Sequence, residues 1–177
     1  MSTDRIGPLT VAVALVIGTL VVAGRATAAD APRRASATPT SRRLVVSIPD
    51  RKLAVVENDE VVSVFPVAVG NPSTPSPVGT FTVINRIANP TYYSPGKVIG
   101  PGVANPLGTR WIGLSEKGYG IHGTDNPRSI GYAKSHGCIR LRNEDVERLF
   151  ERVRTGDVVE LHTERTPELG RLFGEAR

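Results

Sequence analysis

A single cysteine stands out in the segment KSHGCIRLRN, which covers residues 134–143. Cys138 is the only cysteine of the chain, His136 lies two residues before it, and Arg140 lies two residues after it. A lone thiol is more often a small buried apolar group than a reactive one. Here Gly137 leaves room for a carbonyl group to approach. A thiol with a base nearby is a typical nucleophile for acyl transfer.

Two histidines are candidates for the base. His136 is close in sequence, but neighbours on one backbone seldom align for proton transfer. His122, in the segment YGIHGT, ends an apolar stretch and enters a glycine turn, which is typical of a side chain at a strand end. His162 lies in the last apolar stretch and is expected to be structural. A zinc site formed by His122, His136 and Cys138 is an alternative, but this spacing matches no common ligand pattern.

The N-terminus predicts export. Residues 9–24 (LTVAVALVIGTLVVAG) form an uncharged apolar run, and residues 26–28 then offer an A-x-A cleavage site. We expect residues 1–28 to be a signal peptide or an uncleaved membrane anchor, and the rest to reach the periplasm or cell wall. In such an oxidising compartment a single cysteine forms no internal disulfide, so a retained thiol needs another reason.

The charge of the chain limits its partners. A formal net charge of +5 fits either a solvated basic surface or affinity for an acidic polymer such as a cell wall. No basic run interleaved with aromatic residues occurs. A nucleic-acid partner is therefore not expected.

The remaining sequence predicts a mostly β domain. Residues 29–43 are rich in Pro, Ala, Ser, Thr and Arg and are expected to be a flexible linker. Short β-branched runs that are apolar on both faces then favour strands packed in a sandwich. The expected strands cover residues 44–48, 52–57, 61–70, 79–87, 111–114, 120–122 and 157–162. The Pro- and Gly-rich residues 89–108 are expected to form a long functional loop.

One segment has helical periodicity. In NEDVERLFERVRTG, which follows the cysteine segment directly, apolar residues recur at helical spacing. Asn143 is expected to be the N-cap and Gly156 the C-terminal stop. Residues 163–177 are expected to be a tail with at most a turn of helix.

The central part of the chain resembles the L,D-transpeptidase catalytic domain, found in bacterial enzymes that cross-link the cell wall. The signature of that family is His-Gly followed by Ser/Thr-His-Gly-Cys, here residues 122–123 and 135–138. Residues 69–83 resemble the family's strand and Thr-Pro-x-Gly turn, with Ser76 in place of the usual Thr. Residues 104–114 resemble its Asn-Pro-Leu-Gly and Trp segment. The resemblance covers residues 44–162 and implies mixed β-sheets packed as a sandwich, with one main helix after the cysteine.

The resemblance also implies a reaction that needs no cofactor and no metal. Cys138 would attack the bond between diaminopimelate (or lysine) and D-alanine in a peptidoglycan tetrapeptide. His122 would act as general base and then acid, and the carbonyl of Gly123 would orient its imidazole. An amine of a second stem, or water, would resolve the thioester. Carbapenem-type β-lactams are expected to be covalent inhibitors of the same thiol.

Further residues would support the site in the family's manner. Ser135 and His136 would brace the loop, and the backbone N–H groups of Gly137 and Cys138 would bind the oxyanion. Arg140 would hold the site or a substrate carboxylate, and residues 89–108 would form a lid over the donor groove. We also expect water to reach the glycine-lined site, so that a charged His122 lowers the pKa of the thiol.

Three other functions fit parts of the pattern. An L,D-carboxypeptidase would use water as the acceptor, and an exported cysteine peptidase would use the same nucleophile and base on another substrate. A wall-binding module would need no thiol chemistry. Neither of the last two explains the His-Gly and Ser-His-Gly-Cys pair as well as transpeptidation does. The sequence leaves open whether the signal is cleaved, which acceptor is used, and which residue precedes D-alanine.

Overall fold

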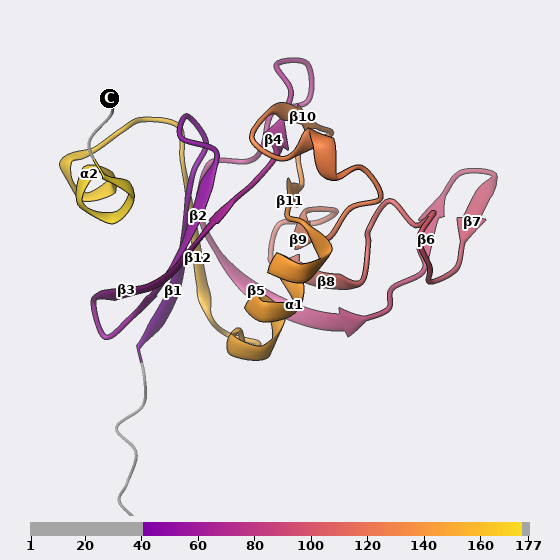
Figure 1. Ribbon diagram of the computed structural model, residues 1–177, viewed down its shortest axis with the longest axis horizontal. Helices are drawn as coiled ribbons and strands as arrows, with labels where there is room; N and C mark the ends of the chain where they lie inside the picture. Colours follow the sequence, from indigo (N-terminus) through magenta and orange to yellow (C-terminus); the bar gives the residue numbers. More distant parts are fainter. Residues whose placement is uncertain (1–40, 175–177) are drawn as a thin grey trace, which may run out of the picture. The chain divides into compact units, whose positions relative to one another are not determined.

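The computed structural model describes residues 41–174, so the expected signal peptide and most of the expected linker lie outside the described residues. Within them, eight strands form one curled sheet in the order β11-β9-β8-β5-β12-β1-β2-β3, while β10 pairs with β4 and β6 pairs with β7 (Figure 1). The strands are β1 (Arg42–Ser47), β2 (Lys52–Glu57), β3 (Glu60–Pro66), β4 (Val69–Gly70), β5 (Gly79–Ala88), β6 (Tyr92–Ser94), β7 (Lys97–Ile99), β8 (Arg110–Leu114), β9 (Gly120–His122), β10 (Ala133–Ser135), β11 (Ile139–Arg140) and β12 (Val158–His162). The helices are η1 (Pro127–Ser129), α1 (Asn143–Arg152) and α2 (Pro167–Phe173).

Strand β5 joins the two halves of this sheet. Its residues 79–82 pair with β12, whereas its second half, from residue 83 on, pairs with β8. Side chains from both halves and from α1 meet in one buried cluster, which includes Leu44, Leu53, Ile112, Ile121, Leu149 and Val159. The expected sandwich of mixed sheets is therefore confirmed, and its two layers are continuous through β5.

Strand β1 is buried on both faces, as its unbroken apolar run predicts. Leu44 and Val46 enter the main cluster, whereas Val45 packs with Leu169 and Phe173 of α2. Thr166 caps this helix by accepting a hydrogen bond from the N–H of Leu169 (3.3 Å). The tail thus forms a seven-residue helix that covers the sheet, where at most a turn was expected.

The domain begins slightly earlier than the sequence predicts. Strand β1 starts at Arg42, inside the expected linker. Arg42 forms ion pairs with Glu57 and Asp157, at 2.9 and 3.4 Å, so neighbouring strands supply partners for the charge. Polar composition alone therefore does not mark the boundary.

The hairpin between β2 and β3 follows its turn signal. Asn58 and Asp59 both have positive φ values, 51° and 64°, as a two-residue type I′ turn requires. The single strand expected over residues 61–70 is wrong, however. It divides after Pro66, which has no N–H to donate, and β4 pairs with β10 instead of continuing along β2.

Helix α1 differs from its expected cap and end. Its N-cap is Arg142 and no side chain caps it, while Val153 closes it before Gly156. The side chain of Asn143 bonds to the loops around His122 instead.

No helix within residues 41–174 is long and apolar enough to cross a membrane.

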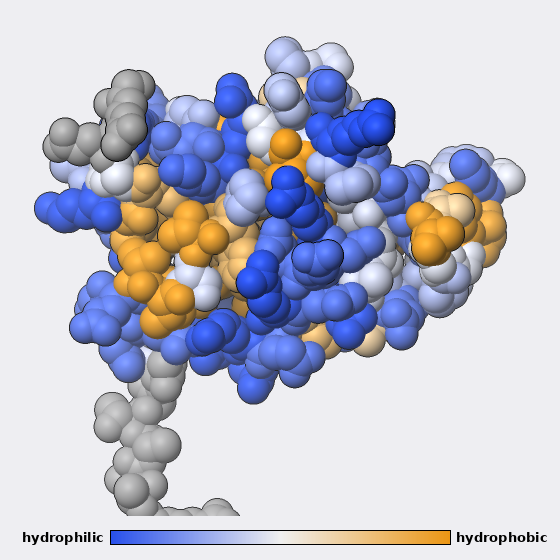
Figure 2. Space-filling model, in the orientation of Figure 1, coloured by the Kyte–Doolittle hydropathy of each residue, from blue (hydrophilic) through white to orange (hydrophobic). Residues whose placement is uncertain are grey.

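The long loop expected over residues 89–108 contains a small hairpin, formed by β6 and β7. This hairpin projects from the rest of the domain (Figure 1), and apolar side chains gather on it (Figure 2). Tyr93 and Val98 are 73% and 68% exposed. The buried Asn105 holds the loop at its base, because its Nδ2 donates to the carbonyl of Pro90 (2.7 Å) and its Oδ1 accepts from the N–H of Leu107 (2.8 Å).

Candidate active site

The parallel pairing of β9 and β11 brings the two motif segments together. Ile139 pairs with Ile121 and Arg140 with His122. Both isoleucines are buried in the core, and successive side chains of a strand point to opposite faces. His122 and Arg140 therefore lie on the other face, and Cys138, next to Ile139, joins them there.

A tryptophan supports the imidazole from the next strand. Trp111 pairs with His122 between β8 and β9, and the two rings stack with their centroids 5.7 Å apart. The Nε1–H of Trp111 donates to Oδ1 of Asn85 at 3.1 Å. A Cβ on Gly120 would collide with this indole, so glycine is required where Trp111 crosses β9.

The hydrogen bond of His122 fixes its tautomer. Its Nδ1 lies 2.6 Å from the carbonyl oxygen of Gly123. A carbonyl oxygen only accepts hydrogen bonds, so Nδ1 carries the proton and Nε2 of the neutral ring keeps a free lone pair. The imidazole is thus poised to take up a proton at Nε2.

Burial keeps both candidate catalytic groups neutral. It lowers the pKa of His122 to about 4, and Arg140 adds to this effect, while the hydrogen bond to the carbonyl of Gly123 opposes it. Burial also raises the pKa of the Cys138 thiol, although the backbone of Gly120 and the charge of Arg140 oppose the rise. The expectation that a charged His122 lowers the thiol pKa is therefore wrong, because desolvation outweighs the charge effect.

The loop that carries the cysteine is braced by Ser135. Its Oγ donates to the carbonyl of Cys138 (2.6 Å) and accepts from the N–H of Gly137 (3.0 Å). Because the Gly137 N–H is already used, it is not free for an oxyanion in this conformation. The N–H of Cys138 makes no hydrogen bond within residues 41–174 and remains available. Gly137 has a φ of 111°, and a Cβ there would collide with the ring of Tyr119.

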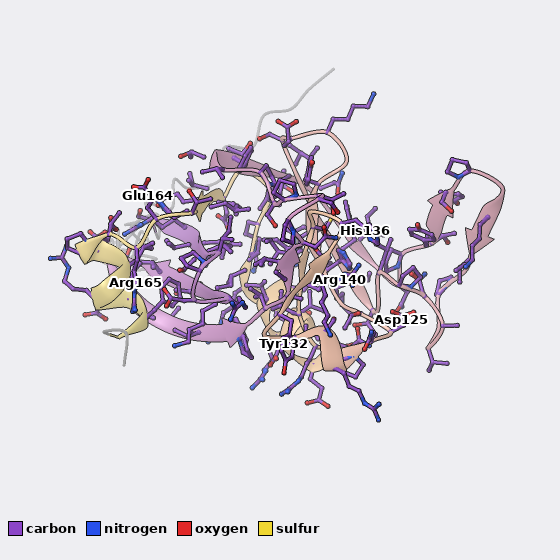
Figure 3. All side chains as sticks on the ribbon, turned by 90° about the horizontal axis from the view of Figure 1, so that it is seen from above. Asp125, Tyr132, His136, Arg140, Glu164 and Arg165 are labelled. Atoms are coloured by element: carbon purple, nitrogen blue, oxygen red, sulfur yellow. The ribbon has the colours of Figure 1, made fainter. Side chains whose placement is uncertain are left out.

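His136 takes no part in this bracing. Its side chain is exposed, and it makes no hydrogen bond within the described part of the chain. His136 and Arg140 lie in the same region of the molecule, far from Arg165 and α2 (Figure 3). His136 lines a pocket together with His122 and Cys138. The role expected for its ring inside the loop is therefore not seen in the structure.

Cys138 lies where two pockets meet. One, of about 390 Å³, adjoins β6 and is lined by Ile87, Pro90, Thr91, Tyr92, Tyr93, Leu107, Trp111, Gly118 and Cys138. The other, of about 290 Å³, is lined by Tyr92, Pro106, Leu107, His122, His136, Cys138 and Arg140. The thiol lies 3.7 Å from the carbonyl oxygen of Gly118, to which its S–H donates. A substrate can therefore approach the sulfur from two sides.

The guanidinium of Arg140 is only partly bonded by the protein. Its NH1 donates to the carbonyl of Lys134 at 3.4 Å, and its buried Nε makes no hydrogen bond. Its charge and spare donors face a pocket shared with the thiol and the imidazole.

Across residues 41–174, no three His, Cys, Asp or Glu side chains are grouped so as to hold a metal ion.

Sequence reasoning gave no role to several residues of this site. Trp111, Tyr92 and Leu107 line the pockets, and of these the sequence marks only the Trp segment, through the family resemblance. Tyr92 and Leu107 carry no local signal, because their place in the site depends on how residues 89–108 fold back over the sheet. Asn143 carries a local signal, but that signal predicts a helix cap.

The site therefore combines a curled β-sandwich, His122 at the end of β9 and Cys138 directly before β11, an arrangement compatible with acyl transfer through a thiol. A family model for the L,D-transpeptidase catalytic domain, YkuD, matches residues 41–161. The chain belongs to this family. The matched residues overlap the segment 44–162 that resembles the family in sequence.

Relatives and solved structures of the same family resemble the chain over its folded part. The "Putative L,D-transpeptidase YkuD" of Bacillus licheniformis is 41% identical over 119 residues, covering 67% of this chain and 64% of that relative. The chain therefore spans less than two thirds of that relative's length. L,D-transpeptidase 3 from Mycobacterium tuberculosis, in complex with a faropenem-derived adduct, is 26% identical with a TM-score of 0.57, covering 71% and 61% of the two chains. LD transpeptidase LdtMt1, in complex with imipenem, is 25% identical with a TM-score of 0.59, covering 70% and 59%.

Proposed function

We propose that this protein is an L,D-transpeptidase that acts on peptidoglycan stem peptides, with Cys138 as nucleophile and His122 as general base. The observation that carries the proposal is the hydrogen bond from His122 Nδ1 to Gly123, which leaves Nε2 free on the face that carries Cys138. The family membership of the chain supports the substrate class.

The neutral state of both groups indicates how the first step proceeds. The thiol gives its proton to Nε2 of His122 as the sulfur attacks the carbonyl carbon before D-alanine. No stable thiolate is needed beforehand, because the imidazole receives the proton during the attack. General base catalysis of this kind contributes about 10²–10⁴ in rate.

The second half of the acylation returns the same proton. The tetrahedral intermediate breaks its C–N bond, and His122 donates the proton to the departing amine of D-alanine, which leaves a thioester on Cys138. The amine of a second stem then attacks the thioester, and His122 accepts its proton. The C–S bond breaks, the thiol is restored, and the cross-link forms. If water attacks instead, the product is a tripeptide and the enzyme is an L,D-carboxypeptidase.

The two pockets and Arg140 fit this sequence of steps. The pocket next to β6 and the pocket at His122 both include Cys138 in their lining, so donor and acceptor can reach the thioester separately. Arg140 supplies a positive charge for a stem carboxylate. The N–H of Cys138 is an oxyanion donor, and one such donor contributes about 10²–10³ in rate.

Covalent inhibition by carbapenem-type β-lactams is part of the proposal. Two related structures are titled as complexes with imipenem and with a faropenem-derived adduct. A strained lactam carbonyl offers the sulfur of Cys138 the same attack as the stem amide.

The decisive experiment is mass analysis of products from purified disaccharide-tetrapeptide. We expect loss of D-alanine and formation of a cross-linked dimer, and neither with Cys138→Ala. Release of tripeptide alone would favour the carboxypeptidase, and cleavage of casein without action on muropeptides would favour a cysteine peptidase. Binding to sacculi without turnover would favour a wall-binding module.

We also propose that the chain is exported by residues 1–28, since its substrate lies outside the cytoplasm. Replacing Val16 with Arg interrupts the apolar run. The variant should accumulate in the cytoplasm, as cell fractionation would reveal. N-terminal sequencing of the exported protein would distinguish cleavage near Ala28 from an intact anchor, and unchanged export of the variant would overturn the proposal.

A further inference from the structure

We infer that Asn143 is a positioning residue for the general base: its amide fixes the peptide unit whose carbonyl holds the imidazole of His122. The inference builds on the proposed function only in that it treats His122 as the base. Asn143 is the first residue of α1, a helix that packs against β8 and β9.

The argument begins with one peptide unit, the one between Gly123 and Thr124. Its carbonyl oxygen accepts the hydrogen bond from His122 Nδ1 (2.6 Å), and its N–H donates to Oδ1 of Asn143 (3.2 Å). The C=O and N–H of a trans peptide unit point in opposite directions. Holding the N–H on the Asn143 side therefore aims the carbonyl at the imidazole.

Two further hydrogen bonds fix the amide itself. Oδ1 of Asn143 also accepts from the N–H of Thr109 (3.2 Å), and Nδ2 donates to the carbonyl of Thr124 (3.2 Å). The amide thus ties the start of β8 to the turn after β9. Both loops contact the Asn143 amide through backbone groups, so these contacts depend on the shape and polarity of the amide and not on the side chains of Thr109 and Thr124.

Two glycines leave the space that this amide fills. A Cβ on Gly108 or on Gly123 would collide with Oδ1 of Asn143. Gly108 also has a φ of 64°, which favours glycine. The close approach of two backbone segments to one side-chain oxygen explains both glycines of the Leu-Gly-Thr and His-Gly-Thr segments.

The helix does not account for this side chain. Asn143 lies inside α1, whose N-cap is Arg142, and no side chain caps the helix. A residue that served only helix stability would need none of the bonds to Thr109 and Thr124. Its polar contacts are instead directed at the loop that sets the His122 tautomer.

The first test measures the tautomer directly, by ¹⁵N NMR of the imidazoles in the full-length chain at pH 8. The chain has only three histidines, so His122 can be assigned by comparison with His122→Gln. We expect wild type to hold the Nδ1–H tautomer and Asn143→Ala to show a mixture of the two. An Nε2–H tautomer in wild type, or an unchanged tautomer in a folded Asn143→Ala, would overturn the inference.

Two variants separate positioning from general loss of stability. Thr166→Ala removes the cap of α2, which costs about 1 kcal/mol, far from the site, and should leave the tautomer unchanged. Asn143→Asp keeps an oxygen for both N–H groups but loses the donor to the Thr124 carbonyl, so it should keep more of the Nδ1–H tautomer than Asn143→Ala does. If Asn143→Asp loses the Nδ1–H tautomer to the same extent as Asn143→Ala, the hydrogen bonds accepted by Oδ1 do not position the imidazole, and the inference fails.

The kinetic arm rests on the proposed function. Asn143→Ala should lower kcat by about 10²-fold, as expected for a misplaced catalytic group, while KM changes by less than about threefold because substrate contacts remain. Absence of turnover in wild type would refute the proposed function and leave the tautomer result to decide on Asn143. Turnover in wild type with an unchanged kcat in Asn143→Ala would refute the positioning role alone.

Discussion

Arg140 lies directly opposite His122 in the register of β11 and β9. Its positive charge lowers the pKa of both His122 and Cys138. The same charge therefore stabilises a thiolate and destabilises an imidazolium. In the proposed attack the sulfur would gain negative charge while the imidazole gains positive charge, so Arg140 would act on the two partners in opposite directions.

Removing this charge should make the thiol less acidic. We expect Arg140→Gln to move the pH profile of iodoacetamide alkylation at Cys138 to higher pH, since the thiolate loses a stabilising charge. Arg140→Lys keeps the charge and should move the profile less. Arg171→Gln removes an exposed charge on α2 and should leave it unchanged. A shift to lower pH in Arg140→Gln would contradict the electrostatic role.

The sequence is sufficient to select the two candidate reacting groups but not to predict their protonation. The two motif segments identified His122 and Cys138, and each lies at or beside a short strand of the same parallel pair. The error about the thiol pKa arose from the glycines around the site. Gly120 is covered by the indole of Trp111, and Gly137 lies against the ring of Tyr119. Glycine admitted aromatic rings rather than water, and such packing is not visible in the sequence.

The depressed pKa of His122 should appear in the pH dependence of stability. The folded pKa is about 4 and the ordinary value about 6.5, so below pH 6.5 the unfolded chain binds the proton that the folded chain refuses. The free energy of unfolding therefore has its full value above pH 6.5 and decreases as the pH falls towards about 4. The full loss is about 3 kcal/mol.

Urea unfolding at pH 7.5, 6, 5 and 4, roughly spanning the two pKa values, measures this loss. The comparison protein is His122→Gln, which has no titrating group at this position but retains His136 and His162. The free energy of unfolding of wild type should fall more steeply with acid than that of the variant. Parallel curves would mean that His122 is not buried in the neutral form.

The main strands were predictable and the loops over the site were not. Strand β2 and the turn at Asn58 and Asp59 match their local patterns, since one hairpin needs no distant partner. The hairpin in residues 89–108 is held by the buried Asn105, whose partners lie up to fifteen residues away. Asn143 carried an N-cap signal, yet its bonds go to residues 19 and 34 positions distant. From local sequence alone, an asparagine that bonds to distant loops cannot be distinguished from one that caps a helix.

Gly120 should not tolerate even a methyl group. Gly120→Ala would push the Trp111 indole away from its stack on His122. We expect a loss of stability of about 1–3 kcal/mol, as for other overpacked sites, and a lower kcat. Gly170→Ala is the control, because a Cβ there meets nothing within 4 Å and alanine suits a helix. Thermal unfolding and turnover of both variants would test this, and a fully active Gly120→Ala would contradict the supporting role of Trp111.

Imipenem should acylate the protein at Cys138 and nowhere else. The thiol passes its proton to His122, the sulfur attacks the lactam carbonyl, the ring C–N bond breaks, and His122 returns the proton to the ring nitrogen. Nothing leaves in this step, so intact-protein mass spectrometry should show a gain equal to the whole inhibitor. The treated protein should also no longer react with iodoacetamide, because Cys138 is its only thiol.

The variants assign this reaction to its two groups. Cys138→Ala should keep its fold and show no adduct, since a small side chain replaces a small one at a half-buried position. His122→Ala should still form the adduct, but about 10²–10⁴ times more slowly, because the thiol is left without its base. The same rate in His122→Ala and wild type would remove His122 from the role of base. An adduct on a peptide that lacks Cys138 would remove the cysteine from the role of nucleophile, and with it the proposed mechanism.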